Sequence, residues 1–423
     1  MALREKSLEK LRWILKKLAQ LTLLRYHPGV ITVTGSVGKT STKLAIAAVV
    51  GSMRSVRASS RNYNNEIGVP FTVISGREKV GGPIFWLSMI LAAAFRIVFK
   101  MRYPEILVLE YGADRPGDIK YLLEIARPTV AVITAVGDIP AHVEYYAGSK
   151  AVAREKGRTI ETLPAAGFAV LNFDDATVMD LEERTRAKVM TFGFGDGADV
   201  RVTNFETRSA DDGRPVGIAF KLECGGSVVP VRLDGVFGKA QGYAAAAAAC
   251  VGLIFGMNLV KISEALADYQ PASGRMTLLA GIKGTFVIDD TYNASPLSMH
   301  AALDTLRDLS AKGGSASGGK ARRKVAVLGD MLEIGKYAIE AHEELGRLAA
   351  KVVDTLITVG PRAKFIAEGA KVAGMPKKKI MSFDSADEAK VSVQGLLRKG
   401  DIVLLKASRA IGLDKIVEEI RQF

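Results

Sequence analysis

Cysteine is scarce in this 423-residue chain, in which only Cys224 and Cys250 occur and their spacing is not that of a metal site. This scarcity excludes the disulfide framework of a small secreted scaffold and indicates two buried thiols in a reducing compartment. The N-terminus also lacks an apolar core followed by a small-residue cleavage site, so it does not resemble a secretion signal. We therefore expect a cytoplasmic protein.

Long apolar runs are missing as well. The nearest approach, residues 83–100 (PIFWLSMILAAAFRIVFK), is interrupted by Arg96 and is shorter than the ~20 residues that span a bilayer. We expect a buried or interfacial helix there. Residues 1–27 are basic and carry leucine and isoleucine at helical spacing, which is typical of a helix on an anionic membrane surface or of one packed on its own domain. Peripheral contact with the inner face of a membrane is thus one hypothesis for this segment.

Acidic residues are fewer than basic ones: the chain has 45 Asp and Glu residues and 58 Lys and Arg residues, which gives a formal net charge of +13. This charge suits nucleotides, phosphorylated small molecules or an anionic membrane surface, and it selects none of them. We expect small-molecule substrates, no nucleic acid and a monomer. The length predicts two or three domains, and an apolar content of 48% supplies their cores.

Short apolar runs alternate with segments long enough for helices, which predicts an α/β fold with buried parallel strands. In the first part of the chain, the predicted strands lie at 29–35, 105–112, 129–137 and 167–175. Residues 198–234 alternate apolar and polar positions, which indicates an antiparallel or mixed extension. After this extension the alternation of apolar runs and helix-length segments begins again, with strands predicted at 285–290, 324–329, 355–360 and 402–406.

Three parts follow from this pattern. We expect residues 1–27 to form the basic amphipathic segment and residues 271–423 a Rossmann-like C-terminal α/β domain. In residues 28–270 a glycine-rich turn ending in Gly-Lys-Thr follows the first predicted strand, so we expect a P-loop-type central ATPase domain with a parallel sheet. The low-complexity stretch 311–323 is expected to be a loop inside the last domain.

A glycine-rich loop, TVTGSVGKTSTK (32–43), follows the first predicted strand and opens a helix. It departs from the Walker A pattern because Val33 stands where that pattern has its first glycine. Backbone N–H groups at such a turn can hold phosphate oxygens, and a lysine and a threonine hydroxyl can reach the terminal phosphates and Mg²⁺. The predicted ATP-binding residues here are Gly35, Ser36, Gly38, Lys39, Thr40 and Ser41.

The shortened loop resembles the ATP loop of the Mur ligases, the amide-forming enzymes of peptidoglycan precursor synthesis. Further similar motifs, in order, are NYNNEIGVP, VLEYGADRPGDI, ITAVGDIPAHVEYY, FVIDDTYNASPLSM, VLGDMLEIG and LLKASR. The pair DDTYNASP and LGDMLEIG resembles the MurF branch, which adds D-alanyl-D-alanine to UDP-N-acetylmuramoyl-tripeptide. The resemblance implies that ATP activates a carboxylate as an acyl phosphate, with UDP-linked muramoyl peptide and D-alanyl-D-alanine as substrates.

The resemblance also implies roles for individual residues. Two Mg²⁺ ions are expected: one near Thr40 and Glu110, the other held by His142 and by a carbamylated Lys156, because a carbamate turns a cation into an anionic ligand. The alternative for Glu110 is a strand-end charge. Without the resemblance, His142 would be interpreted as a structural histidine and Lys156 as a solvated surface lysine. Lys39, Lys156, His142 and Arg275 are the expected catalytic residues.

The remaining expected sites concern nucleotide and substrate. Arg275 is expected at the ATP phosphates, Asp290 at the ribose, Tyr292 near the nucleotide and Gln241 at adenine. Gln241, together with Phe237, stands where the family usually has asparagine and histidine. The expected substrate-binding residues are Asn64, Asn65, Asn293, Asp330, Glu333, Lys406, Ser408 and Arg409, of which Asn293 reads equally as a turn former.

The chain departs from the family in one further respect, because only about thirty residues precede the ATP loop, where family members carry a domain that grips UDP. How UDP is held therefore stays open. Residues 1–27 and 84–99 are expected either to form a substrate platform or membrane-facing patch, or simply to pack together. The alternatives to a MurF-type ligase are another Mur-superfamily ligase, such as one like folylpolyglutamate synthase, and a non-catalytic membrane-associated nucleotide switch.

Overall fold

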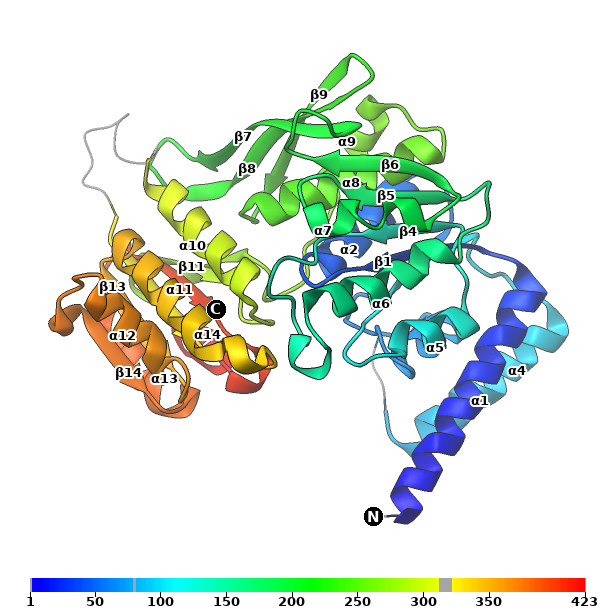
Figure 1. Ribbon diagram of the computed structural model, residues 1–423, viewed down its shortest axis with the longest axis horizontal. Coiled ribbons are helices and arrows are strands. Elements are labelled where there is room, and N and C mark those ends of the chain that lie inside the picture. Colours follow the sequence, from blue (N-terminus) through cyan, green and yellow to red (C-terminus); the bar gives the residue numbers. More distant parts are fainter. Residues whose placement is uncertain (1, 79–80, 312–321, 423) are drawn as a thin grey trace.

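The structure, a computed structural model, describes residues 2–78, 81–311 and 322–422. These residues form two sheets packed against helices, with the helices α1 and α4 side by side at the edge farthest from the second sheet (Figure 1). The α/β fold expected from the sequence is confirmed. The domain limits at residues 27 and 270 stay predictions.

The first sheet has nine strands in the order β2-β3-β1-β4-β5-β6-β7-β8-β9. Neighbours from β2 to β7 are parallel, whereas β7, β8 and β9 pair antiparallel, as the change of pattern near residue 198 indicated. The strands are β1 (Gly29–Thr34), β2 (Val56–Ala58), β3 (Ile106–Glu110), β4 (Val130–Ile133), β5 (Phe168–Asn172), β6 (Lys188–Gly193), β7 (Val200–Ser209), β8 (Pro215–Cys224) and β9 (Ser227–Asp234).

The helices of this domain include an alanine-rich one, α8, that packs against α2 and against β5, β6 and β7. Its six consecutive alanines, 244–249, are fully or almost fully buried, because side chains this small let the helix lie close to its neighbours. The helices are α2 (Lys39–Gly51), α3 (Gly68–Ile74), α5 (Asp118–Ile125), α6 (Ser149–Glu161), α7 (Ala176–Met179), α8 (Lys239–Ile254) and α9 (Leu259–Ala267).

Two helices lie outside this arrangement, α1 (Ala2–Tyr26) and α4 (Pro83–Phe99). Both pack on one apolar cluster, to which α1 contributes Leu15 and Ala19 and α4 contributes Met89 and Ala93. The expected helices at both segments are thereby confirmed, and the two do pack together. Within the described residues, neither these helices nor any other has the length and apolar character needed to cross a bilayer.

The second sheet has six strands in the order β10-β11-β15-β12-β13-β14, and only β10 runs antiparallel to its neighbour. All four strands predicted in this half are present. The strands are β10 (Thr277–Gly281), β11 (Thr285–Asp289), β12 (Lys324–Gly329), β13 (Thr355–Val359), β14 (Ile380–Phe383) and β15 (Ile402–Lys406). The helices are α10 (Pro296–Ala311), α11 (Ala338–Val352), α12 (Lys364–Val372), α13 (Ala386–Leu396) and α14 (Asp414–Ile420).

Strand register decides where functional side chains gather. In the first sheet Val33 pairs with Glu110 and Thr34 with Ile133, so β1, β3 and β4 end at one edge. In the second, Asp289 pairs with Leu405 at the ends of β11 and β15. Loops at the carboxyl ends of parallel strands are where α/β sheets bind ligands, and both sets of strand ends line one cavity.

Candidate functional site

The phosphate loop has the backbone geometry that glycine alone allows. Gly35 has φ 145° and Gly38 φ 87°, and a Cβ on Gly35 would lie 2.0 Å from Oγ1 of Thr134. Helix α2 begins directly after Gly38, and no side chain caps its N-terminus. The open N–H groups and the helix dipole suit this turn to an anion, and the binding of phosphate there stays a prediction.

Lys39 folds back over this loop. Its Nζ donates to the carbonyl oxygens of Gly35 at 2.8 Å and Ser36 at 3.3 Å. Burial lowers the pKa of the Lys39 ammonium, and the neighbouring charge of Glu110 opposes that shift. A phosphate bound in the loop would supply the further negative charge that favours the protonated lysine.

Glu110 lies at the centre of a buried polar cluster. Its Oε2 accepts hydrogen bonds from Oγ1 of Thr40 at 2.8 Å and from Nζ of Lys43 at 3.1 Å. Burial opposes ionisation, but Lys43, Lys39 and Arg275 outweigh it and hold the pKa of Glu110 below its ordinary value. The predicted pair of Thr40 and Glu110 is therefore brought together, with Glu110 as the ionised partner.

Lys43 was not expected from the sequence. It is fully buried one helical turn after Lys39, and it also donates to the carbonyl oxygen of Arg61 at 2.7 Å and to the hydroxyl of Ser59 at 3.1 Å. The four-residue spacing from Lys39 is the signal that could have placed it on the same helix face.

The oxygen atoms of Thr40 and Glu110 fit Mg²⁺, which prefers hard oxygen ligands and is usually bound by one or two carboxylates together with phosphates and waters. Among the described residues no group of three or more His, Cys, Asp or Glu side chains forms a ready-made metal cage.

His142 and Lys156 line the same cavity as the phosphate loop. His142 has φ 66°, and its ring lies between two carboxylates, with Nε2 3.3 Å from Oδ1 of Asp114 and Nδ1 2.5 Å from Oε2 of Glu333. Burial lowers the pKa of His142, although the negative charges of Asp114 and Glu333 act to raise it. Asp114 was missed by the sequence analysis, although it lies in one of the motifs compared there.

Lys156 is 1% exposed, and no acceptor for its Nζ is found in the described part of the chain. Burial, followed by the charge of Lys39, lowers its pKa to about 7. A side chain in this state is a neutral amine for a substantial fraction of the time near pH 7. The alternative of a solvated surface lysine is therefore wrong.

The second domain supplies Arg275 and the residues around it. A guanidinium nitrogen of Arg275 donates to Oγ1 of Thr40 at 2.9 Å, so this arginine links the two domains at the phosphate loop. Its guanidinium lies 4.2 Å from the ring centre of Tyr292, and that of Arg409 lies 5.2 Å from the same ring. Gln241 accepts from the hydroxyl of Tyr269 at 2.9 Å and donates to the carbonyl of Arg275 at 3.2 Å.

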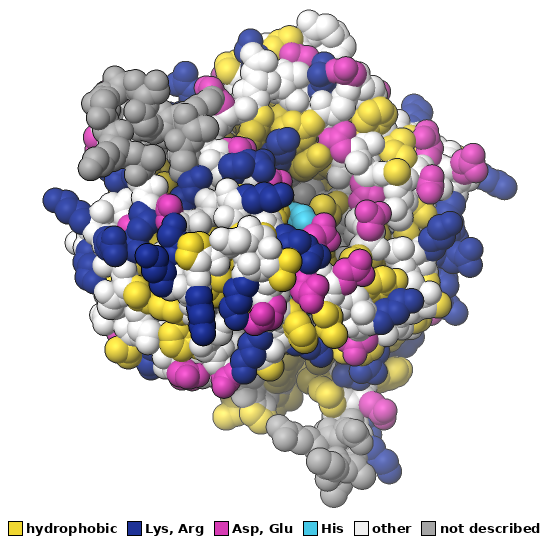
Figure 2. All heavy atoms as spheres, turned by 60° about the vertical axis from the view of Figure 1, so that its left-hand side comes forward, with side chains coloured by type: hydrophobic (Ala, Val, Ile, Leu, Met, Phe, Trp, Pro, Cys, Tyr) yellow, Lys and Arg dark blue, Asp and Glu magenta, His cyan; other side chains and the backbone are white. Residues whose placement is uncertain are grey.

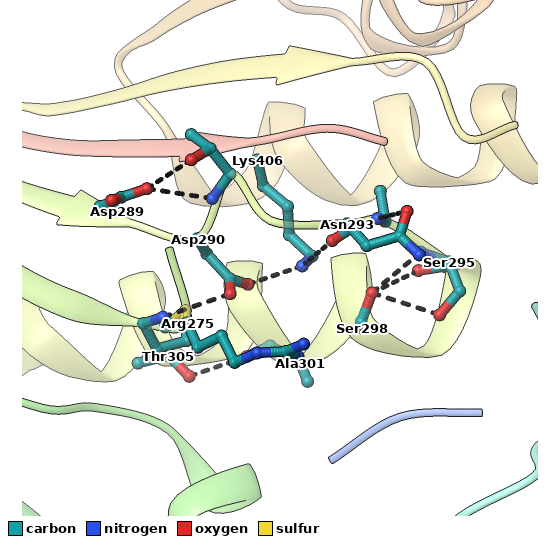
Figure 3. Close-up of polar contacts among 12 residues, drawn as sticks. Arg275, Asp289, Asp290, Asn293, Ser295, Ser298, Ala301, Thr305 and Lys406 are labelled. Atoms are coloured by element: carbon teal, nitrogen blue, oxygen red, sulfur yellow. Dashed lines mark hydrogen bonds and ion pairs between the residues drawn. The ribbon is translucent and has the colours of Figure 1, made fainter. Parts of the chain in front are cut away.

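Asp290 and Lys406 form an ion pair with 2.6 Å between Oδ2 and Nζ (Figure 3). Lys406 also donates to the carbonyl of Asn293 at 2.9 Å, and Oδ1 of Asp290 accepts from the N–H of Met276 at 3.2 Å. Burial raises the pKa of Asp290 in spite of this lysine. The loop after β11 is thus tied to the end of β15.

The cavity that these groups line has a volume of about 540 Å³. Charged side chains of both signs surround a hollow on this face (Figure 2). The predicted site residues among its lining are Ser36, Gly38, Lys39, Ser41, Asn64, Glu110, His142, Lys156, Gln241, Arg275, Asp290, Tyr292, Asn293, Glu333, Lys406, Ser408 and Arg409.

Two residues expected at the substrate do not line this cavity. The carboxylate of Asp330 is 1% exposed and accepts a hydrogen bond from the N–H of Ala363 at 2.6 Å, so it supports the neighbouring loop. Oδ1 of Asn65 accepts from the N–H of Gly68 at 2.9 Å and fixes the turn before α3. Ser408 does reach the cavity, but its hydroxyl is already engaged by the N–H of Leu332 at 2.9 Å.

Comparison with known proteins agrees with this geometry. The family profile of the Mur ligase middle domain matches residues 93–252, and that of the Mur ligase glutamate ligase domain matches residues 274–409. The UDP-N-acetylmuramoyl-tripeptide–D-alanyl-D-alanine ligase of Mycobacterium leprae is 32% identical over 92% of this chain and 72% of its own length. The Bacillus subtilis ligase of the same name is 29% identical over 96% of this chain and 79% of its own length.

A solved structure shows the same likeness. MurF of Thermotoga maritima, in complex with ADP, superimposes with a TM-score of 0.76 at 29% identity, covering 96% of this chain and 82% of that one.

Proposed function

The chain belongs to the Mur ligase family, and from that premise we propose that it is an ATP-dependent ligase that joins D-alanyl-D-alanine to UDP-N-acetylmuramoyl-tripeptide in peptidoglycan precursor synthesis. The observation that carries this proposal is the convergence of Lys39, the Thr40–Glu110 pair and Arg275 on one loop. Cations and oxygen ligands from two domains meet where the phosphates of ATP would lie.

The chemistry is amide formation through an acyl phosphate. A carboxylate oxygen of the muramoyl peptide attacks the γ-phosphorus, the bond to the β-phosphate oxygen breaks, and ADP leaves. The amine of the dipeptide then attacks the acyl carbon, and phosphate leaves with the carboxylate oxygen that it received. The amine loses its proton as the amide forms.

The chain's own residues serve these steps by charge and position. Lys39 and Arg275 offset the negative charge that spreads over the transferred phosphoryl group. Thr40 and Glu110 would hold one Mg²⁺, which when bound supplies positive charge beside the phosphates. Arg409, with its guanidinium 5.2 Å from the ring centre of Tyr292, lies on the same cavity and is available to an anionic part of either substrate.

Carbamylation of Lys156 belongs to the same proposal. Its amine would add to the carbon of CO₂ and release one proton, leaving a carbamate anion. Three observations support this: the side chain is buried, it lines the cavity, and its pKa of about 7 leaves a neutral amine available. The carbamate oxygens and His142 would then offer ligands to a second Mg²⁺.

The test is a panel of acid and amine pairs with purified protein, ATP and Mg²⁺, in which ADP release and amide product are measured together. We expect both with UDP-N-acetylmuramoyl-tripeptide and D-alanyl-D-alanine. Lys39→Ala should abolish both, whereas the exposed control Lys351→Ala should change neither. Product only with a folate and glutamate would indicate the other ligase class, and nucleotide binding without any amide would indicate a switch.

A further inference from the structure

The outer faces of α1 and α4 remain uncovered after the two helices have packed. Both helices bury one side on the same apolar cluster, through Leu15 and Ala19 in α1 and Met89 and Ala93 in α4. The C-terminal ends of the helices are also joined, because the hydroxyl of Tyr26 donates to the carbonyl of Arg96 at 2.7 Å. The sides turned away from the cluster lie on the edge of the molecule opposite α11 to α14 (Figure 1).

The exposed side of α4 is a continuous apolar stripe. Its members recur at intervals of three and four residues and are between 52% and 85% exposed: Ile84, Leu87, Leu91, Phe95 and Val98. Within α4 the one charged residue is Arg96, which is turned inward and donates to the carbonyl of Ile74 at 3.2 Å. Soluble proteins seldom leave so long an apolar row in water unless another surface covers it.

The exposed side of α1 adds cations to this row. Its solvent-facing residues also recur at helical spacing: Lys6, Lys10, Trp13, Lys17, Leu21 and Leu24. Three more exposed cations lie near the joined ends of the two helices: Arg25, Lys100 and Arg102. Among the described side chains of α1, α4 and residues 100–102, Glu9 is the one exposed carboxylate.

We propose that α1 and α4 together form a docking surface for an anionic lipid bilayer, on which the protein lies without crossing it. Interfacial helices bury an apolar face at the boundary of head groups and acyl chains, and basic residues beside that face are attracted by anionic lipids. The apolar stripe, the exposed Trp13 and the six cations match both requirements. A second copy of the same surface would offer six further cations and, among its described side chains, the single exposed carboxylate of Glu9, so charge complementarity favours lipid over self-association.

The placement leaves the proposed catalytic site accessible. The cavity lies between the two sheets, whereas the docking surface is at the far edge of the central domain (Figure 1). A bilayer under α1 and α4 would therefore hold the ligase at a membrane with the cleft open to substrates. The inference is independent of the proposed reaction, since it rests on side chains outside the cavity.

The experiment uses the full chain and vesicles of pure phosphatidylcholine or of phosphatidylcholine with phosphatidylglycerol. We expect co-sedimentation with the anionic vesicles only, and its loss in about 1 M salt, where the Debye length falls to about 3 Å. Substituting Lys6, Lys10 and Lys17 with glutamine should lower the partition coefficient by about 100-fold, taking about fivefold for each charge. The matched control replaces Lys377, Lys378 and Lys379, which are exposed in the other domain.

Insertion is tested by two further variants. Leu91→Gln with Phe95→Gln should abolish vesicle binding. The control pair Val372→Gln with Val391→Gln, whose side chains are even more exposed and lie in the C-terminal domain, should leave it unchanged. In a Trp86→Phe background Trp13 is the remaining tryptophan, and brominated lipid should quench its fluorescence. Nucleotide binding verifies that each variant is folded.

Three results would overturn the proposal. The first is that the wild type does not bind anionic vesicles. The second is that the variant with Leu91→Gln and Phe95→Gln still binds them and brominated lipid does not quench Trp13. The third is that the wild type forms a stable dimer and this variant is a monomer.

Discussion

Replacing Lys156 with methionine should make the ligand-free protein more stable while removing its activity. Lys156 is buried, no acceptor for its ammonium is found among the described residues, and methionine has a similar length and no charge. The shift of its pKa from 10.5 to about 7 corresponds to about 5 kcal/mol, which is an upper value for the free energy that the buried charge costs the folded state.

The effect should depend on pH with a definite sign. Between about pH 7 and 10.5 the unfolded chain binds a proton that the folded chain lacks, so the free energy of unfolding of the wild type rises across this window. The advantage of Lys156→Met should therefore be full below about pH 7 and vanish towards pH 10.5.

Urea unfolding followed by circular dichroism, in CO₂-free buffers from about pH 6 to 10, measures this difference. Lys351→Met, in which the substituted side chain is exposed, is the control and should show no such trend. A Lys156→Met protein that is less stable than wild type at pH 6, or a difference that does not change with pH, would refute the reasoning.

Two further substitutions test the phosphate loop. Lys43→Met leaves the carboxylate of Glu110 buried without its ion-pair partner, so we expect the free energy of unfolding to fall by about 3 kcal/mol, with part of it recovered when Glu110→Gln is added. Urea unfolding of the single and double variants checks this, and additive losses would argue against the pair. Arg275→Ala removes a cation from the loop and from the face of Tyr292, so kcat should fall about 10²-fold without loss of stability. Steady-state kinetics with saturating ATP measures this, and an unchanged kcat would show that Arg275 has no role in the reaction.

The sequence was sufficient for the parallel strands around the phosphate loop and for the pairing of Thr40 with Glu110, but it did not give the order of the strands. Thr40 follows β1 and Glu110 ends β3, and parallel neighbours bring such positions to one edge. Lys43 was not recognised, because its four-residue spacing from Lys39 shows only that the two lysines share a helix face, and a lysine inside a helix is usually exposed. Asp330 was misplaced for a related reason: a loop at a strand end can turn its side chain into the cleft or, as here, towards Ala363.

The peripheral helices show a second limit of the sequence. Periodicity predicted both α1 and α4, but it could not say which side of each helix would be covered. The expected mutual packing is confirmed, since Leu15 and Met89 are buried on one cluster. Trp13 and Leu91 face solvent, and the membrane-facing patch stays a prediction. Only the arrangement of the two helices on the domain separates these faces.

The most direct test of the central claim is transfer of isotope from the acid substrate to phosphate. UDP-N-acetylmuramoyl-tripeptide labelled with ¹⁸O in its reacting carboxylate is incubated with the protein, ATP, Mg²⁺ and D-alanyl-D-alanine, and the products are analysed by mass spectrometry. We predict the amide-linked pentapeptide product together with phosphate that carries one ¹⁸O atom from the carboxylate. Unlabelled phosphate, or ADP release without the amide, would contradict the account.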